Sequence, residues 1–300
     1  MPVTSTVPTT KAFPDTRVFA VLVIYERSLD RVEGWPALNR MLQERPQCGV
    51  PGLAHLLLYD NSRAPLSAVP ERPGLTYRHD PENGGTAAAY RVALAQAMAM
   101  GLPWLLLLDH DTTLPGDYLR RMTPAFLSAV DAPDIAALLP GIRHREGVLI
   151  SPVRVTRWGT MQPLAVDAEV RAGEHVSAIA SGAILRVGAL SAVMPLPEDL
   201  WLDYVDHWIF AEMHRKGLKA LVADQVLQHD LSIQSPATMS PSRLASILRG
   251  EAKFHRVLGV GARLAYPFRL ARRIARLGLT NPRLAISGLR SLFAPRAARP

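Results

Sequence analysis

Long apolar runs divide the first half of the chain into strand-length segments. Residues 17–25 (RVFAVLVIY) are apolar from Val18 onward and rich in β-branched side chains, which is typical of a parallel strand covered on both faces. Residues 104–109 (WLLLLD) show a similar pattern and predict a second buried strand. Two further strands are predicted between these two, at 53–60 and 75–79.

Helix-like segments follow these strands. Residues 85–101 have the composition of a helix, with Thr86 as the expected N-cap and Gly101 as the expected terminator. Pro115 is expected to begin the helix that follows 104–109. This alternation of strands and helices predicts an α/β domain with a Rossmann-like, mostly parallel sheet flanked by helices.

The second half of the chain is less regular. Residues 201–217 predict a loop that enters a helix, which Gly217 ends. Residues 218–229 predict a strand with His229 at its tip. Shorter strands are predicted before these elements, at 134–142, 147–155 and 175–187.

Three of the predicted strands end in polar residues. Tyr25 and Glu26 close the first strand, and Asp60 closes the second. Asp109 closes the strand at 104–109, with Asp111 two residues later. Because ligands of such sheets bind beyond the carboxyl ends of parallel strands, we expect these clusters to face one crevice.

The pair Asp109 and Asp111 indicates a cation site. Alternation along an extended segment would put both carboxylates on the same side, and hard oxygen ligands suit Mg²⁺ or Mn²⁺, which commonly bridge to phosphate. His229 could complete the site as a neutral imidazole. The alternative is a polar turn in which Asp111 caps the next helix and His229 is a hydrogen-bonded structural residue.

Residues 82–90 (ENGGTAAAY) place Asn83, Gly84 and Gly85 directly before a helix. Glycine allows the backbone to approach a ligand closely, and the free N–H groups of a helix N-terminus favour anions. An ordinary glycine-rich turn is the alternative. The segment lacks the pattern Gly-x-Gly-x-x-Gly, so a nicotinamide enzyme is not supported.

Two carboxylates, Asp203 and Asp206, stand at the entrance to the helix in 201–217. Either is a candidate general base that takes the proton of an acceptor hydroxyl. The alternative is helix capping, because the backbone dipole stabilises an anion at this position.

Composition narrows the class of protein. Apolar residues make up 48% and charged residues 20% of the 300 residues, which is typical of a globular protein of one large domain or of a domain with an appendage. The single cysteine, Cys48, permits no intrachain disulfide and no cysteine-based zinc site, as expected in a reducing compartment. No apolar run approaches the roughly 20 residues of a spanning helix.

Positive charge is concentrated in the last fifth of the chain. Residues 241–300 hold 13 lysines and arginines against one acid, Glu251, whereas the first 240 residues hold 21 basic and 25 acidic ones. In 264–279 and 284–293 arginine alternates with apolar residues, which suits a helix lying on an anionic membrane surface. Packing on the domain, or on a partner chain in an oligomer, is the alternative. The few aromatic residues and the lack of a recognition motif argue against nucleic acid.

The sequence therefore predicts three parts. Residues 1–16 form a flexible N-terminal tail without a secretory signal, residues 17–240 form the α/β domain, and residues 241–300 form a basic amphipathic helical segment. We expect a cytoplasmic location, peripheral on the inner face of the cytoplasmic membrane if the last segment binds it.

The order of these motifs resembles that of the inverting family 2 glycosyltransferases with the GT-A fold. Within that family it most resembles the bacterial rhamnosyltransferases and galactofuranosyltransferases. The resemblance covers residues 17–235 and runs from Tyr25 and Asp60 through Asn83–Gly85 and Asp109–Asp111 to ASGAILRVGAL (180–190), LWLDYVDHWIFAEMHRKG (200–217) and VLQHDLS (226–232).

The resemblance implies a metal-dependent inverting enzyme that moves a rhamnose- or galactofuranose-like sugar from a nucleotide-diphosphate sugar to a glycan or lipid-linked acceptor in cell-surface polysaccharide synthesis. The implied cofactor is a divalent cation, Mn²⁺ or Mg²⁺. The implied nucleotide-sugar residues are Tyr25, Glu26, Asp60, Asn83, Gly84, Gly85 and Asp109; the metal ligands are Asp109, Asp111 and His229; the acceptor side is Ser181 and Gly182; and the catalytic base is Asp206, with Asp203 as the alternative.

Two other functions stay open. Asp109, Asp111 and Thr113 also resemble the Asp-x-Asp-x-Thr motif of the haloacid dehalogenase-type phosphohydrolases, in which the first aspartate is the nucleophile. The downstream Gly-Asp-x-x-x-Asp motif of those enzymes is lacking. An inactive nucleotide-binding module is the third hypothesis, because Val205 and Trp208 replace acidic residues that the resemblance leads us to expect near the base.

Overall fold

The computed structural model describes residues 15–44, 49–144, 147–166, 168–229 and 240–293. Most of the predicted N-terminal tail lies outside these residues. The strands, in chain order, are β1 (Arg17–Ile24), β2 (Gly52–Asp60), β3 (Leu75–His79), β4 (Trp104–Asp109), β5 (Thr112–Thr113), β6 (Ile135–Arg143), β7 (Leu149–Ser151), β8 (Val153–Val155), β9 (Met161–Pro163), β10 (His175–Ser177), β11 (Ile184–Arg186) and β12 (Lys219–His229).

Helices pack on the strands, and in the described part of the chain three more helices follow the last strand. A 3₁₀ turn, η1 (Leu29–Arg31), precedes the first α-helix. The α-helices are α1 (Trp35–Met41), α2 (Gly85–Ala99), α3 (Tyr118–Arg121), α4 (Thr123–Val130), α5 (Val187–Ala192), α6 (Val205–Arg215), α7 (Pro241–Val257), α8 (Val260–Thr280) and α9 (Pro282–Phe293).

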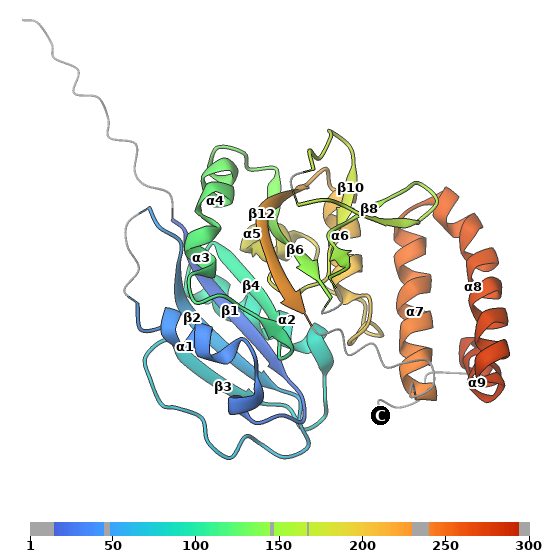
Figure 1. Cartoon of the computed structure of the whole chain (residues 1–300), viewed down its shortest axis with the longest axis horizontal. Helices are drawn as coiled ribbons and strands as arrows, with labels where there is room; N and C mark the ends of the chain where they lie inside the picture. The colour runs from blue at the N-terminus through green and yellow to red at the C-terminus, as the bar shows by residue number, and fades with distance from the viewer. Residues whose placement is uncertain (1–14, 45–48, 145–146, 167, 230–239, 294–300) are drawn as a thin grey trace, which may run out of the picture.

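The larger sheet of the described residues has the strand order β3-β2-β1-β4-β11-β6-β12-β5, with β7 beside β6. Figure 1 labels β3, β2, β1, β4, β6 and β12 of this sheet. Strands β3, β2, β1 and β4 run parallel to one another, and β12 is parallel to β6. Strand β11 runs antiparallel to both β4 and β6. The predicted α/β class with a mostly parallel sheet is therefore confirmed.

The sheet is buried on both faces because its strand residues alternate between two cores. On β1, Phe19 and Val21 lie in the core shared with α2, α5 and α6, while Ala20 and Leu22 lie in the core shared with α1, α3 and α4. This alternation explains why residues 17–25 are apolar almost throughout.

Two local predictions were wrong. Thr86 is not the N-cap of α2: Gly84 holds that position, and the Thr86 hydroxyl donates a hydrogen bond to the Leu202 carbonyl at 3.2 Å. The helix after β4 begins at Tyr118 rather than at Pro115. The strand predicted at 134–142, by contrast, is confirmed as β6, shifted by one residue. It lies between β11 and β12, where both of its edges are paired.

The prediction that the segment from Asp109 to Asp111 is extended was also wrong. Strand β4 ends at Asp109, and the chain turns before Thr112 and Thr113 pair antiparallel with the end of β12. The turn, rather than strand alternation, therefore sets the relative position of the two carboxylates.

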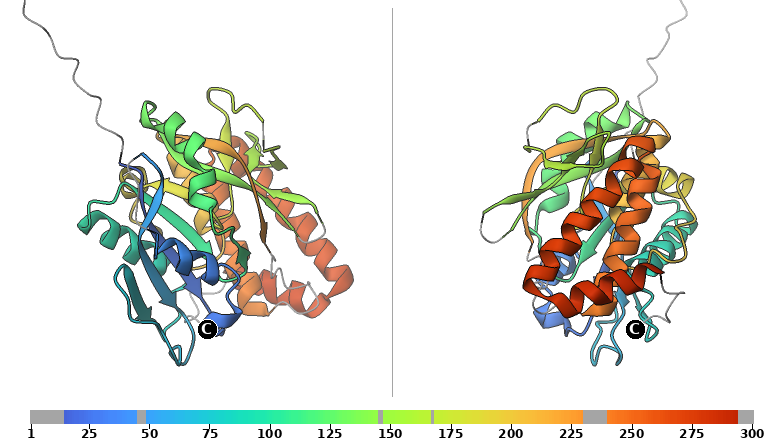
Figure 2. Two further views of the ribbon diagram at one scale, coloured as in Figure 1. Left: turned by 60° about the vertical axis from the view of Figure 1, so that its left-hand side comes forward. Right: turned by 90° about the vertical axis from the view of Figure 1, so that its right-hand side faces the viewer.

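Helices α7, α8 and α9 pack on one another beside the α/β domain (Figures 1 and 2). Their shared core consists of apolar residues from all three helices, among them Leu248, Ile274 and Leu284. Phe254 of α7 reaches the domain itself and packs with Val153 and Ala211. No helix among the described residues is long and apolar enough to cross a membrane.

Candidate functional site

The predicted polar strand tips do meet at one edge of the sheet. Strand β1 lies between β2 and β4, with Ile24 opposite Asp60 and Val23 opposite Asp109. The Glu26 N–H donates a hydrogen bond to Ser62 Oγ at 2.7 Å, which ties the first tip to the second. Residues about 35 and 85 positions apart along the chain are thus brought together by strand pairing.

Most polar groups at the first two strand tips form hydrogen bonds within the protein. Asp60 is fully buried, and its carboxylate accepts hydrogen bonds from the Leu66 N–H at 3.2 Å and the Tyr77 hydroxyl at 2.8 Å, besides one from Ser62 N–H at 3.0 Å. Tyr25, by contrast, is 45% exposed. Of the residues predicted to hold a base and ribose here, Tyr25 has the ring that is open to a planar ligand.

Hydrogen bonds to two side chains hold the loop from Asn83 to Gly85 in place. The Gly84 N–H donates to Asp80 Oδ2 at 3.0 Å, and the Gly85 N–H donates to Asn61 Oδ1 at 3.3 Å. A Cβ on Gly85 would come within 2.1 Å of the Trp201 carbonyl oxygen. Gly85 therefore allows α2 to approach the segment that leads to Asp203.

Replacing Gly85 with alanine is expected to destabilise the protein by at least about 2 kcal/mol, because the added Cβ meets backbone and the φ angle is +70°. Gly101→Ala is the matched control: its φ angle is +62°, but nothing lies within 4 Å of the added atom, so about 1 kcal/mol is expected. Denaturant unfolding measures both. Equal losses would mean that the approach to Trp201 is unimportant.

Asp109 lies in an acidic environment at the end of β4. Its Oδ2 accepts a hydrogen bond from Ser181 Oγ at 3.1 Å. Burial, with the negative charges of Asp111 and Asp206 nearby, raises the pKa of Asp109 to about 7. Burial, with the charges of Asp109 and Asp206, also raises the pKa of the enclosed Tyr90 hydroxyl. Three carboxylates, two from the end of β4 and the turn after it and one from α6, therefore share one electrostatic environment.

Asp111 and His229 lie together at the end of β12. Both are buried, and His229 Nδ1 is 3.5 Å from Asp111 Oδ1 and 3.1 Å from Thr112 Oγ1. Pairing of Thr112 with His229 in the sheet creates this contact. The structure thus places the predicted histidine beside the predicted carboxylate, although 118 positions separate them.

The fit to a divalent cation is partial. The oxygen donors of Asp109 and Asp111 suit a hard cation, whose positive charge would lower the Asp109 pKa that burial and the neighbouring carboxylates raise. Within the described ranges, however, no three His, Cys, Asp or Glu side chains converge as a metal site. These residues therefore fit a cation that also takes ligands from a bound phosphate, and not one held by the protein alone.

The two candidate bases have different surroundings. Asp206, in the first turn of α6, accepts hydrogen bonds from the Ala180 N–H at 3.1 Å and the His207 N–H at 2.7 Å, and its charge acts on Asp109. Asp203, whose side chain is 11% exposed, forms an ion pair with Arg243 of α7 at 2.8 Å. Burial raises the pKa of Asp203 despite this partner. Asp206 is therefore the carboxylate better placed beside Asp109.

Ser181 and Gly182, predicted on the acceptor side, are both buried. Ser181 contacts Asp109, and the Gly182 carbonyl accepts a hydrogen bond from the Tyr118 hydroxyl at 2.6 Å. A Cβ on Gly182 would lie 2.5 Å from the Leu227 side chain. In this structure, then, Ser181 positions Asp109 and Gly182 packs in the core.

Sequence reasoning missed Arg243. Its charge reaches the site from the C-terminal segment, because it pairs with Asp203 and also counteracts the rise in the Asp109 pKa. The concentration of basic residues after position 240, against an acidic excess before it, was the available signal. Spacing along the chain gave no indication of which arginine would reach the site.

Arg243→Gln is expected to destabilise the protein by about 1–3 kcal/mol, because Asp203 then stays largely buried without its cation. Adding Asp203→Asn should recover part of that loss. Arg256→Gln, at an exposed position of the same helix, serves as the control and should cost less than about 0.5 kcal/mol. A double variant no more stable than Arg243→Gln would contradict the pairing.

Residues with a left-handed backbone conformation lie at or next to the predicted site residues. Among the described residues other than glycine, positive φ angles occur at Glu26 (49°), Asn83 (48°) and Tyr204 (63°). Each costs roughly 1 kcal/mol and persists only where the surroundings enforce it, which is common at functional sites. All three adjoin predicted site residues.

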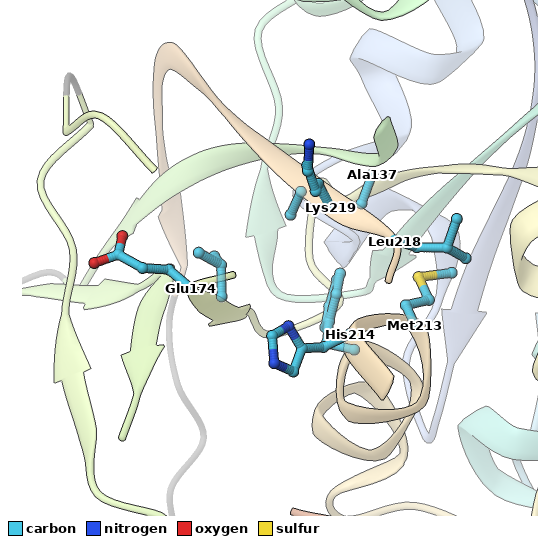
Figure 3. Close-up of a pocket in the computed structure, with 9 residues that line it drawn as sticks. Ala137, Glu174, Met213, His214, Leu218 and Lys219 are labelled. Carbon is cyan, nitrogen blue, oxygen red and sulfur yellow. The ribbon is translucent and has the colours of Figure 1, made fainter. Parts of the chain in front are cut away.

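A pocket elsewhere in the structure takes in none of these residues. It is lined by Ala137 of β6, Lys219 of β12 and side chains of neighbouring segments that include Glu174 and His214 (Figure 3). Ala137 and Lys219 lie near the amino ends of their strands, whereas His229 lies at the carboxyl end of β12. This pocket is therefore at the opposite edge of the sheet from the carboxylates.

No family model matches this sequence, and no curated protein matches it. Solved structures do match. The mannosyltransferase PcManGT from Pyrobaculum calidifontis, in complex with GDP-Man and Mn²⁺, is 16% identical with a TM-score of 0.52, over 92% of this chain and 74% of that one. S. aureus TarS 1-349 in complex with UDP-GlcNAc is 13% identical with a TM-score of 0.50, over 91% and 79%.

The chain spans 50% of the length of the longer S. aureus TarS structure, at 11% identity and a TM-score of 0.46 over 83% of this chain. At such identities the likeness shows the fold. The fold is a mixed α/β arrangement with a mostly parallel sheet flanked by helices, similar to that of the mannosyltransferase.

Proposed function

We propose that this chain is a glycosyltransferase that uses a nucleotide-diphosphate sugar. The observation that carries the proposal is the gathering of Asp109, Asp111 and Asp206 at the carboxyl edge of a sheet whose fold is similar to that of PcManGT. That protein was solved with GDP-Man and Mn²⁺, and TarS 1-349 with UDP-GlcNAc.

In this proposal the exposed Tyr25 stacks on the nucleotide base, with Glu26, Asp60 and the Asn83–Gly85 loop shaping the donor site around it. Asp109 and Asp111, with His229 beside them, hold a divalent cation together with the donor diphosphate. When bound, the cation offsets the negative charge that develops on the departing nucleoside diphosphate.

Asp206 acts as the general base. Its carboxylate, fixed by two backbone N–H groups, accepts the proton of an acceptor hydroxyl as the oxygen attacks the anomeric carbon. The bond from that carbon to the diphosphate oxygen breaks on the opposite face, so one displacement inverts the anomeric configuration. The proposed sugar is rhamnose- or galactofuranose-like, and the acceptor is a glycan or a lipid-linked saccharide of cell-surface polysaccharide synthesis.

The phosphohydrolase alternative is less well supported. The Gly-Asp-x-x-x-Asp motif of those enzymes is lacking downstream of Asp109. Asp109 also ends the fourth strand along the chain, after three strands that pair in parallel.

A thermal-shift panel tests the proposed function. UDP, GDP, dTDP and their sugar conjugates are each added with Mn²⁺, with Mg²⁺ or with EDTA. We expect one nucleotide to raise the melting temperature by several degrees only when a divalent cation is present. No stabilisation by any nucleotide, or stabilisation unchanged by EDTA, would argue against a metal-dependent donor site.

A further inference from the structure

Helix α8 carries an exposed apolar stripe that plays no part in the proposed chemistry. Its large members are strongly exposed: Val260 by 70%, Leu264 by 64%, Phe268 by 79% and Leu279 by 88%. Because the spacings along the stripe are three or four residues, all members lie on one side of the helix. The full stripe is Val260, Leu264, Phe268, Ala271, Ala275 and Leu279.

The stripe is not the face that holds the three C-terminal helices together. Ile274 and Leu277 point to the other side of α8, where they are buried against Leu244 and Leu248 of α7 and Leu284 of α9. Helix α8 therefore has two apolar faces, and one of them is enough for the packing seen in Figure 2.

The charge around the stripe is of one sign. Residues 260–293 contain seven arginines and neither aspartate nor glutamate. Arg269 and Arg273 bind protein groups, namely the Gly159 carbonyl at 2.7 Å and Glu251 at 2.7 Å. Arg263, Arg272, Arg276, Arg283 and Arg290 are exposed.

A tryptophan extends the apolar face beyond the helix. Trp158 is 47% exposed, and its ring would lie 3.4 Å from a Cβ placed on Gly261. Gly261 is seven residues before Phe268, and so Trp158 lies on the stripe side of α8. The Arg157 guanidinium lies 5.0 Å from the Trp158 ring centroid. Exposed tryptophan flanked by arginine is typical of side chains at a membrane–water interface.

We propose that this face, made of the α8 stripe with Trp158 and the exposed arginines of α8 and α9, docks on an anionic lipid surface. The apolar side chains enter the boundary of the acyl chains, and the arginines contact the lipid phosphates. Charge complementarity selects this occupant, since a second copy that docked by the same face would bring the same exposed arginines to the interface. The helix lies on the bilayer, and the proposal does not depend on the proposed sugar transfer.

Vesicle sedimentation of the full chain tests the proposal. We expect the protein to pellet with vesicles of phosphatidylglycerol and phosphatidylcholine at low salt, and much less with phosphatidylcholine alone or at high salt. Phe268→Glu and, separately, Arg272→Gln with Arg276→Gln should each lower the partition coefficient at least tenfold. Vesicle binding should also shift tryptophan emission to shorter wavelength, and less so in Trp158→Phe.

Matched controls come from the opposite part of the molecule. Leu127→Glu places the same charge on α4, where the leucine is 53% exposed, and Arg120→Gln with Arg121→Gln removes two exposed arginines from α3. Both should bind vesicles as the wild type does. Equal losses in test and control variants, or no pelleting at low salt, would overturn the proposal. A concentration-dependent dimer that Phe268→Glu disrupts, without vesicle binding, would instead assign the face to a second copy.

Discussion

Asp206→Asn is expected to lower the rate of sugar transfer by about a thousandfold while leaving the donor affinity within a few-fold of the wild type. The amide keeps the size of the carboxylate but cannot accept the acceptor proton. One of the two oxygens that accept the Ala180 and His207 N–H groups becomes an NH₂ group, so a stability loss of about 1–2 kcal/mol is also expected. Transfer and donor binding must therefore be measured well below the melting temperature.

Asp203→Asn is the control for this experiment. The Asp203 carboxylate is largely buried against Arg243, so its loss should act mainly on stability and should leave transfer within about tenfold of the wild type. If transfer were nearly normal in Asp206→Asn but collapsed in Asp203→Asn, the base would be Asp203. If both variants were nearly normal, neither carboxylate would be the base.

Asp109→Asn is expected to abolish cation-dependent donor binding and, in EDTA, to make the protein more stable above pH 7. Burial raises the folded-state pKa of Asp109 to about 7 from an ordinary value of 3.8, so the folded protein holds this proton more tightly than the unfolded chain does. The contribution of Asp109 to stability is therefore complete below about pH 4 and is lost as the pH rises through 7. Asparagine, which stays neutral, avoids that loss.

The expected gain is on the order of 1–2 kcal/mol at pH 8, reduced from the full linkage value because Asp109 is partly exposed. It should vanish near pH 4. Melting temperatures at pH 4, 6 and 8 in EDTA measure it, and donor titration with Mn²⁺ measures the loss of binding. Asp111→Asn should also lose cation-dependent binding. A variant that is less stable than the wild type at pH 8 would show that the Asp109 charge is compensated in the folded protein.

The strands of the first half could be predicted to within about one residue, and the reason is local. In β1, β2 and β4 the apolar side chains fill both faces of a parallel sheet, so an unbroken apolar run of strand length has few other stable structures. Gly101 and Gly217 likewise end their helices with positive φ angles, which the residue type itself permits.

Predictions failed where a contact distant in the chain decided the local structure. Thr86 has a side chain suited to capping, but its hydroxyl donates a hydrogen bond to the Leu202 carbonyl instead. Gly85 allows α2 to lie against Trp201. The turn after Asp109 arises because Thr112 and Thr113 pair with β12, over a hundred residues later. No pattern within 104–113 contains that information.

The candidate site, like the fold, could be predicted from the sequence only in part. The sequence by itself determined which strand tips carry carboxylates, since polar residues after buried runs are visible in one dimension. Only the tertiary structure decided that Asp206 stands beside Asp109 while Asp203 pairs with Arg243, and that α8 turns one apolar face inward and another to solvent. The physical reason is that burial, strand pairing and charge compensation depend on distances in space, whereas sequence periodicity fixes only the direction of side chains within a single element.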